Sequence, residues 1–374
     1  MDFNSGYITT QVWSAISQLP WHWIAPITHV ALALLAAMHA MLYKRDPRAA
    51  LGWVSVCLFI PFAGPLLYYM FGINHIQTRA KKLRHRFRLY VGYERGALSG
   101  HPSSTNVSLD NHQQTFVRVS DRVTSQPLTG GNNIEMLVNG EQAYGAMLAA
   151  IDSATDHVLL VTYLFEWDEI GKAFVSALAA ARRRGVKVYV IVDGVGEWYT
   201  WPRIRWKLRR ANITVARFLP PRLLPPSFSV NLRNHRKILV VDGELGFTGG
   251  MNIGARHLLE TASRRRTADL HFHLQGPVVT QLQTVFNEDW HFITGQSLTF
   301  PKSNVEPSGK SYCRCLSDGP NEDLDKISMV LMGATAAARR DITIVTPYFL
   351  PSQEVIASLQ AGADSPHHPD PRPR

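Results

Sequence analysis

A histidine and a lysine separated by one residue mark the part of this sequence best suited to phosphate chemistry. They are His235 and Lys237, in the stretch NHRKILVVDGELGFTGGMNIG at residues 234–254. Residues 237–241 have the composition of a β-strand, and the alternation of side chains along a strand places His235 and Lys237 on one face. The imidazole can act as a nucleophile or proton carrier, and the ammonium supplies fixed positive charge for phosphate oxygens. The pair therefore predicts attack on a phosphodiester.

Four further residues of the same stretch extend this predicted site. Asp242 ends the strand, where its carboxylate can hold a neighbouring group in place. Gly249, Gly250 and Asn252 follow a second short strand. The glycines let the backbone approach a phosphate closely, and the asparagine amide can donate a hydrogen bond to it. A lone His-x-Lys pair occurs on surface strands by accident, but the complete arrangement is much more specific.

Alternating helices and strands are expected to carry this site. Helical periodicity predicts helices at residues 141–154 and 170–184, and continuous apolar runs predict buried strands at 157–165 and 186–192. Strands separated by helices of this length indicate βαβ units and a mostly parallel sheet.

An internal repeat indicates that this α/β fold is duplicated. Residues 143–165 can be laid over residues 327–349 at an offset of 184, with the same order of helix and strand. In this overlay residues 158–162 align with residues 342–346, which predicts a corresponding second strand there. Chance similarity of two such units is the alternative.

The first 72 residues are far more apolar than the rest and indicate a membrane anchor. Residues 23–43 and 51–71 are two uncharged stretches of 21 residues, each long enough for a helix across a hydrocarbon layer of about 30 Å. A short basic loop joins them, so we expect a hairpin across a bilayer; two buried helices of a soluble domain are the alternative. Six basic residues in 79–88 outnumber three in the loop, which favours a cytoplasmic body.

Composition excludes some classes of protein. The chain of 374 residues has three cysteines, which argues against a disulfide-stapled secreted scaffold. Lys and Arg number 39 against 29 Asp and Glu, a net charge of +10. This excess favours anionic partners such as nucleic acid, anionic lipid or a phosphate-bearing substrate.

The arrangement at 235–242 resembles the HxKxxxxD motif of the phospholipase D superfamily, and the whole chain resembles a bacterial cardiolipin synthase. Further matching segments are TYLFEWDEIGKAF at 162–174, VDGVG at 192–196, DLHFHLQGPVV at 269–279, VFNEDW at 285–290 and IVTPYFLP at 344–351. The resemblance extends from about residue 20 to about residue 361.

This resemblance implies a phospholipase D-like duplicated α/β sandwich, with one motif in each half and one active site between them. It implies phosphatidyl transfer through a phosphohistidine, without a metal or another cofactor. His235 would be the nucleophile or its acid–base partner, Lys237 and Asn252 would bind the phosphate, and Asp242 would orient the site.

The expected organisation has five parts. They are a membrane anchor at 1–72 with two transmembrane helices, a basic segment and linker at 73–134, a first phospholipase D-like half at 135–300, a partial second half at 301–361, and an aberrant Pro-rich tail at 362–374.

The sequence departs from the family pattern in its second half. The repeat offset would place a second histidine at about position 419, beyond the last residue, Arg374. No second His-x-Lys-x4-Asp occurs in the chain. We therefore expect that a frame change or early stop truncated the second half before its motif; a deliberate short form is the alternative.

A single motif leaves the expected chemistry incomplete, because a departing alkoxide needs a proton from a second group. Two copies could pair their motifs across a symmetry axis, as single-motif nucleases of this superfamily do, so a homodimer is one expected arrangement. The truncated sheet would also expose strand edges. We expect poor stability and low or absent activity unless the chain dimerises.

The leading expectation is a cardiolipin synthase-like phosphatidyltransferase of the bacterial inner membrane. It would join two molecules of phosphatidylglycerol, release glycerol, and bind no nucleic acid. A truncated, inactive membrane protein that binds anionic lipid or a partner is the first alternative. A dimeric phosphodiesterase of the nuclease type is the second, and the paired apolar spans argue against it.

Overall fold

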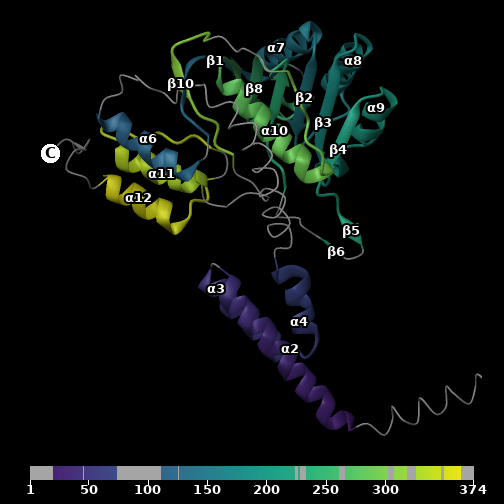
Figure 1. Ribbon diagram of the computed structural model, residues 1–374, viewed down its shortest axis with the longest axis vertical. Helices are drawn as coiled ribbons and strands as arrows, with labels where there is room; N and C mark the ends of the chain where they lie inside the picture. The colour runs from purple at the N-terminus through teal and green to yellow at the C-terminus, as the bar shows by residue number, and fades with distance from the viewer. Residues whose placement is uncertain are drawn as a thin grey trace, which may run out of the picture. The chain divides into compact units, whose positions relative to one another are not determined.

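The chain forms two compact units, Met1–His75 with Arg222–Phe228, and Ile76–Pro221 with Ser229–Arg374. A computed structural model describes residues 20–44, 46–73, 111–124, 126–223, 226–227, 233–260, 266–301, 307–317, 326–346 and 349–363 (Figure 1). The basic segment expected at 79–88 and most of the Pro-rich tail lie outside these residues.

The first unit is mainly helical. Its elements are α2 (Trp21–Tyr43), α3 (Pro47–Phe59), α4 (Ala63–Leu67), the π-helical turn η1 (Tyr68–Gly72), and a small pair of strands, β5 (Arg222–Leu223) and β6 (Pro226–Ser227). α3 begins where the Asp46 side chain accepts a hydrogen bond from the Arg48 amide at 2.9 Å, an ordinary helix cap. Among the described residues, His22–Tyr43 is the one helix whose length and composition suit a membrane span.

The second span expected at 51–71 is not a continuous helix. α3 ends at Phe59, and its 13 residues reach only about 20 Å. The break falls beside Pro61, which lacks the amide hydrogen that would continue the helix. A short helix then folds back: a Cβ on Gly64 would lie 2.1 Å from the Val56 carbonyl oxygen, and the Tyr68 hydroxyl lies 2.8 Å from His39 Nδ1. Two transmembrane helices are therefore not confirmed.

An eight-stranded sheet forms the centre of the second unit, in the order β10-β1-β9-β8-β7-β2-β3-β4. The strands are β1 (Thr129–Val138), β2 (His157–Thr162), β3 (Lys187–Asp193), β4 (Thr214–Phe218), β7 (Ile238–Val241), β8 (Leu245–Gly249), β9 (Leu270–Gln275) and β10 (Ser311–Cys313). β2, β3 and β4 are parallel, and the other pairs are antiparallel. The expectation of a mostly parallel sheet is wrong, because a tight turn between β7 and β8 leaves no room for a crossover helix.

Helices cover both faces of this sheet (Figure 1). α7 (Asn139–Ser153), α8 (Glu169–Arg183) and α9 (Ile204–Arg210) share a core with Val158 and Leu160, whereas α10 (Val278–Thr294) packs on Leu159 and Val161. Every residue of β2 is buried. Burial on both faces explains the continuous apolar run in the sequence, and it confirms the predicted strand and its flanking helices.

The carboxy-terminal elements do not form a second sheet among the described residues. β10 joins the first sheet beside β1, and α11 (Lys326–Ala337) packs against α6 (Asn111–Val123) and α12 (Gln353–Ala363). The strand expected at 342–346 is absent: these residues have no regular structure, and Val345 is 93% exposed. Apolar composition favours a strand only where a neighbouring strand offers hydrogen bonds and burial.

Candidate active site

The ends of four strands meet at one edge of the sheet. Val161 of β2 pairs with Ile238 of β7, Ile238 pairs with Thr248 of β8, and Gly249 of β8 pairs with His271 of β9. The segment before β7 and the loop after β8 therefore lie at the same edge. This register brings together five of the six predicted site residues: His235, Lys237, Gly249, Gly250 and Asn252.

Two buried carboxylates fix the segment that carries the histidine. Asp193, at the end of β3, accepts a hydrogen bond from the Asn234 amide at 3.2 Å. Asp289, in α10, accepts one from Asn234 Nδ2 at 2.7 Å and pairs with Arg236 Nη1 at 2.6 Å. Both aspartates are only 1% exposed. Because buried charged pairs are costly to break, these contacts hold residues 234 and 236 firmly against the body.

The side chains of His235 and Lys237 extend from the other side of this segment than those of Asn234 and Arg236. The imidazole of His235 stacks on the ring of Tyr163, with centroids 4.3 Å apart and planes 21° from parallel. Lys237 Nζ donates to the carbonyl oxygen of His235 at 2.7 Å. β7 begins only at Ile238, so the alternation predicted for a strand is produced here by the contacts of Asn234 and Arg236.

The protonation states of this pair suit attack on phosphorus. Burial lowers the pKa of His235, and the positive charge of Lys237 lowers it further against the opposing effect of Asp193. Burial also lowers the pKa of Lys237 to about 8, although Asp269 opposes this shift. At pH 7 the imidazole is therefore mostly neutral and able to attack, while the ammonium remains mostly charged.

The two glycines make room for other side chains. A Cβ on Gly249 would lie 2.6 Å from His271 Nδ1, and one on Gly250 would lie 2.1 Å from Asp269 Oδ1. His271 is buried, and burial lowers its pKa to about 4, helped by His257 and Lys237. Each glycine thus admits a protein side chain on one side. Close approach of a phosphate to their backbone stays a prediction.

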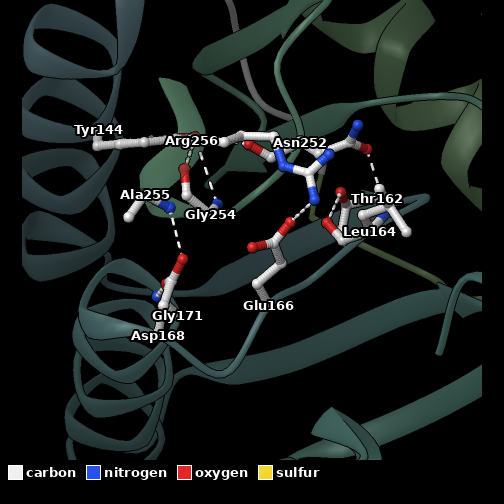
Figure 2. A network of polar contacts seen from close by, with 10 residues as sticks. All are labelled: Tyr144, Thr162, Leu164, Glu166, Asp168, Gly171, Asn252, Gly254, Ala255 and Arg256. Carbon is white, nitrogen blue, oxygen red and sulfur yellow. Dashed lines mark hydrogen bonds and ion pairs between the residues drawn. The ribbon is translucent and has the colours of Figure 1, made fainter. Parts of the chain in front are cut away.

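The loop that carries Asn252 is held by α7 and by the segment after β2 (Figure 2). Asn252 Oδ1 accepts a hydrogen bond from the Leu164 amide at 3.1 Å. The hydroxyl of Tyr144, in α7, lies 2.7 Å from the Asn252 carbonyl oxygen and 2.9 Å from that of Gly254. Fixing Oδ1 in this way also orients Nδ2, so the side-chain amide can donate to an anion at this edge.

Two carboxylates complete that network. Asp168 caps α8 by accepting from the Gly171 amide at 2.9 Å, and it also accepts from the Ala255 amide at 2.5 Å. Glu166 forms an ion pair with Arg256. The loop after β8 is thus tied to the start of α8 as well as to α7.

Asp242 lies away from the other predicted site residues. It follows the far end of β7, whose four residues separate it from Lys237, so that five steps along the strand place the two Cα atoms about 16 Å apart. Its carboxylate accepts hydrogen bonds from the amides of Thr155, Asp156 and His157, at 2.8–2.9 Å. Burial raises its pKa, but these hydrogen bonds outweigh that effect and hold the pKa below the usual value. Asp242 thus anchors the entry to β2, and the expectation that it orients the site stays a prediction.

Several residues of this site were not singled out from the sequence. Asp193, Asp269 and Asp289 lie within the segments VDGVG, DLHFHLQGPVV and VFNEDW, which resemble the family, so the resemblance was the available signal. Tyr163 lies within the segment TYLFEWDEIGKAF, which also resembles the family, whereas Tyr144 gave no such signal. In the described ranges, no group of three or more His, Cys, Asp or Glu side chains gathers as a metal site would require.

Comparison with known proteins identifies the family. Residues 147–290 match the family model described as cardiolipin synthase, PLD-like domain, and residues 31–72 match the phospholipase D-nuclease N-terminal family. Cardiolipin synthase A of Pseudomonas putida KT2440 is 31% identical over 331 residues, which cover 88% of this chain and 69% of that protein. The chain belongs to the cardiolipin synthase family.

Other relatives give a similar comparison. The cardiolipin synthase of Geobacillus kaustophilus HTA426 is 29% identical over 339 residues, which cover 88% of this chain and 66% of that protein. The chain thus spans just under two thirds of the length of this relative. Among solved structures, phosphatidylserine synthase of Haemophilus influenzae Rd KW20 is 13% identical, with a TM-score of 0.42, and covers 66% of this chain and 63% of that one; this likeness is too low to add to the family assignment.

Substituting Asp242→Asn should destabilise the fold with little effect on turnover per folded molecule. At pH 7 it should lower the free energy of unfolding by about 1–3 kcal/mol, because a neutral amide cannot replace all the accepted hydrogen bonds. The difference from the unsubstituted chain should shrink as the pH falls through the depressed pKa of Asp242, since protonation also removes the carboxylate. Unfolding at pH 7 and near pH 3, with Glu244→Gln as the control in the same turn, measures this. An equal difference at both pH values would contradict it.

Substituting Asn234→Ala should lower turnover per folded molecule, and not only the stability of the fold. It removes the contact with Asp289 and the acceptor that Asn234 Oδ1 offers to the Arg236 amide at 3.0 Å, so His235 loses its fixed position. Turnover should fall by about tenfold to a hundredfold. Asn287→Ala is a matched control, because that side chain also makes two hydrogen bonds, both with Leu298. Equal loss of turnover per folded molecule in the two variants would show that the contacts of Asn234 are only structural.

Proposed function

We propose that this chain is a phosphatidyltransferase that joins two molecules of phosphatidylglycerol into cardiolipin and releases glycerol. Membership of the cardiolipin synthase family supports the reaction class, and relatives that carry that name support the product. The observation that carries the proposal is the pairing of the His235 imidazole, stacked on Tyr163, with the ammonium of Lys237, both displayed from a segment fixed by buried aspartates.

In the first step, a ring nitrogen of His235 attacks the phosphorus of one phosphatidylglycerol. The N–P bond forms as the bond from phosphorus to the glycerol oxygen breaks, and that oxygen takes up a proton and leaves as glycerol. Lys237 and the Nδ2 of Asn252 stabilise the negative charge that grows on the phosphoryl oxygens.

In the second step, a hydroxyl of another phosphatidylglycerol attacks the same phosphorus. It gives up its proton as the new O–P bond forms, and the N–P bond breaks to restore His235. Water at this step would release phosphatidic acid instead, so the acceptor must enter a site from which water is excluded.

A second proton carrier is required on the side of the leaving group. We propose that a second copy of the chain supplies it, so that the partner's His235 protonates the departing glycerol and later accepts the proton of the incoming hydroxyl. The pairing places two copies of one motif around one phosphorus, as a two-fold axis requires.

The substrate also places the reaction at a membrane. Phosphatidylglycerol is a bilayer lipid, and His22–Tyr43 can span the hydrocarbon layer by its length and composition. We propose that the chain is anchored in the bacterial inner membrane with its sheet on the cytoplasmic side.

Activity should depend on pH in the form of a bell. In vesicles of phosphatidylglycerol, kcat/KM for cardiolipin formation should rise as the pH increases through the lowered pKa of His235, because the attacking imidazole becomes neutral. It should fall as the partner's His235 loses the proton that the departing glycerol needs, and fall further near pH 8 as Lys237 loses its proton. His235→Ala should abolish turnover. Lys237→Arg should remove the further fall near pH 8 because guanidinium stays charged, while Lys187→Arg, at the opposite end of the strands, should leave the profile unchanged. A further fall that persists near pH 8 in Lys237→Arg would exclude Lys237 as its source.

Mixing active and inactive chains tests the shared site. If both copies must supply His235, randomly paired dimers of the unsubstituted chain and His235→Ala in equal amounts should retain about one quarter of full activity; independent sites would retain about one half. Lipid binding without turnover in any mixture would instead favour an inactive lipid-binding protein.

A further inference from the structure

An exposed group of aromatic side chains lies on the second unit. Trp198, Tyr199, Trp201 and Trp206 are 56%, 70%, 77% and 43% exposed, within nine residues of sequence. Together with Arg203 they form what we call the aromatic patch. We propose that the aromatic patch inserts into the headgroup layer of a bilayer that contains anionic phospholipid, and so positions the active-site edge at the membrane surface.

The aromatic patch is not needed to complete the core. It begins in the 3-10 turn η2 (Gly196–Tyr199) and continues into α9. α9 is attached to the core through Ile204 and Leu208, which are fully buried, so Trp206 points outward from a helix that is already anchored. Soluble proteins seldom expose several large aromatic side chains together without a partner. Tryptophan and tyrosine rings favour the boundary between hydrocarbon and water.

Charge around the aromatic patch matches an anionic surface. The guanidinium of Arg203 lies 5.8 Å from the ring centroids of both Trp198 and Trp206. Arg209 and Arg210 follow on the exposed side of α9. The neighbouring acid, Glu197, is buried and paired with Arg205 at 3.2 Å and Arg217 at 3.3 Å. The negative charge is thus neutralised beneath the surface, and the face presented outward is cationic and aromatic.

The aromatic patch is physically connected to the active-site edge. The side chain of Tyr199 interacts with that of Tyr163, and the ring of Tyr163 supports the imidazole of His235. The turn η2 also lies directly against this residue, since a Cβ on Gly196 would be 2.0 Å from the Tyr163 carbonyl oxygen. Insertion of the aromatic patch would therefore bring His235 to the depth of lipid phosphates. This inference goes beyond the proposed transfer reaction and does not require turnover.

A fluorescent probe can measure the insertion directly. The full chain, with its three native cysteines replaced by alanine, is labelled with an NBD group at Trp201→Cys and reconstituted into vesicles. The matched control is Glu244→Cys, an exposed position in the turn at the far end of β7. In vesicles of phosphatidylcholine and phosphatidylglycerol, the label at 201 should emit at shorter wavelength and be quenched several-fold more strongly by doxyl lipids than the label at 244. Equal quenching at both positions would overturn the proposal in favour of a solvated helix face.

Two further arms test the chemistry of the surface. Arg203→Gln should reduce the difference in quenching at 201 between vesicles with and without phosphatidylglycerol, and an unchanged difference would refute charge recognition. Trp198→Ala with Trp206→Ala should raise the KM for vesicle substrate by roughly tenfold while leaving turnover of monomeric short-chain phosphatidylglycerol unchanged. Equal loss on both substrates would contradict docking. If the chain proved inactive, the fluorescence result would still decide the insertion, so the two proposals fail separately.

Discussion

The active-site edge depends on burying two aspartates beneath a segment of irregular backbone. Asp193 accepts a hydrogen bond from the Asn234 amide. Asp289 accepts one from the Asn234 side chain and forms an ion pair with Arg236. Both carboxylates are buried. A buried carboxylate without partners would be far too costly, so these contacts and the position of the segment require one another. Because alternate residues along an extended chain point in opposite directions, attachment of residues 234 and 236 displays the imidazole of His235. The display of the imidazole is thus a consequence of charge burial in α10 and β3, which are distant in sequence from His235.

A partly buried charge and a nearby carboxylate also occur together at Lys237. Partial burial of its ammonium lowers the pKa of Lys237, and Asp269 limits that effect. Asp269 can stand there because Gly250 has no Cβ, and the neutral imidazole of His271 fills the corresponding space beside Gly249. The glycine pair therefore shapes the electrostatics of the site by admitting side chains, which is a different role from simple access of the backbone to phosphate.

Sequence patterns predicted the parts of this protein that depend on local periodicity or on burial from both sides. The strand expected at 157–165 ends at Thr162, close to its predicted end, because its apolar run is buried whichever neighbours it has. The strand expected at 342–346 has similar composition but no described partner strand, and it is not formed. The helix expected at 51–71 is interrupted beside Pro61. In the site, spacing identified His235 and Lys237, but the carboxylates that fix their segment come from residues 41 and 55 positions away from Asn234, a separation over which no periodicity extends.

The position of Asp242 explains what the spacing of the HxKxxxxD pattern measures. The four residues of β7 lie between Lys237 and Asp242, so the pattern records the length of one short strand. At one end of that strand the chain displays an imidazole and an ammonium; at the other, the aspartate bonds three successive backbone amides at the entry to β2. Since β2 is also the strand that leads to Tyr163, this anchor fixes the register between the strand that leaves the site and the strand that enters it. A shift of one residue would turn β7 side chains to the opposite face, and it would separate His235 from the ring on which it stacks. Asp242 can therefore be required for the position of His235 without contacting the substrate itself.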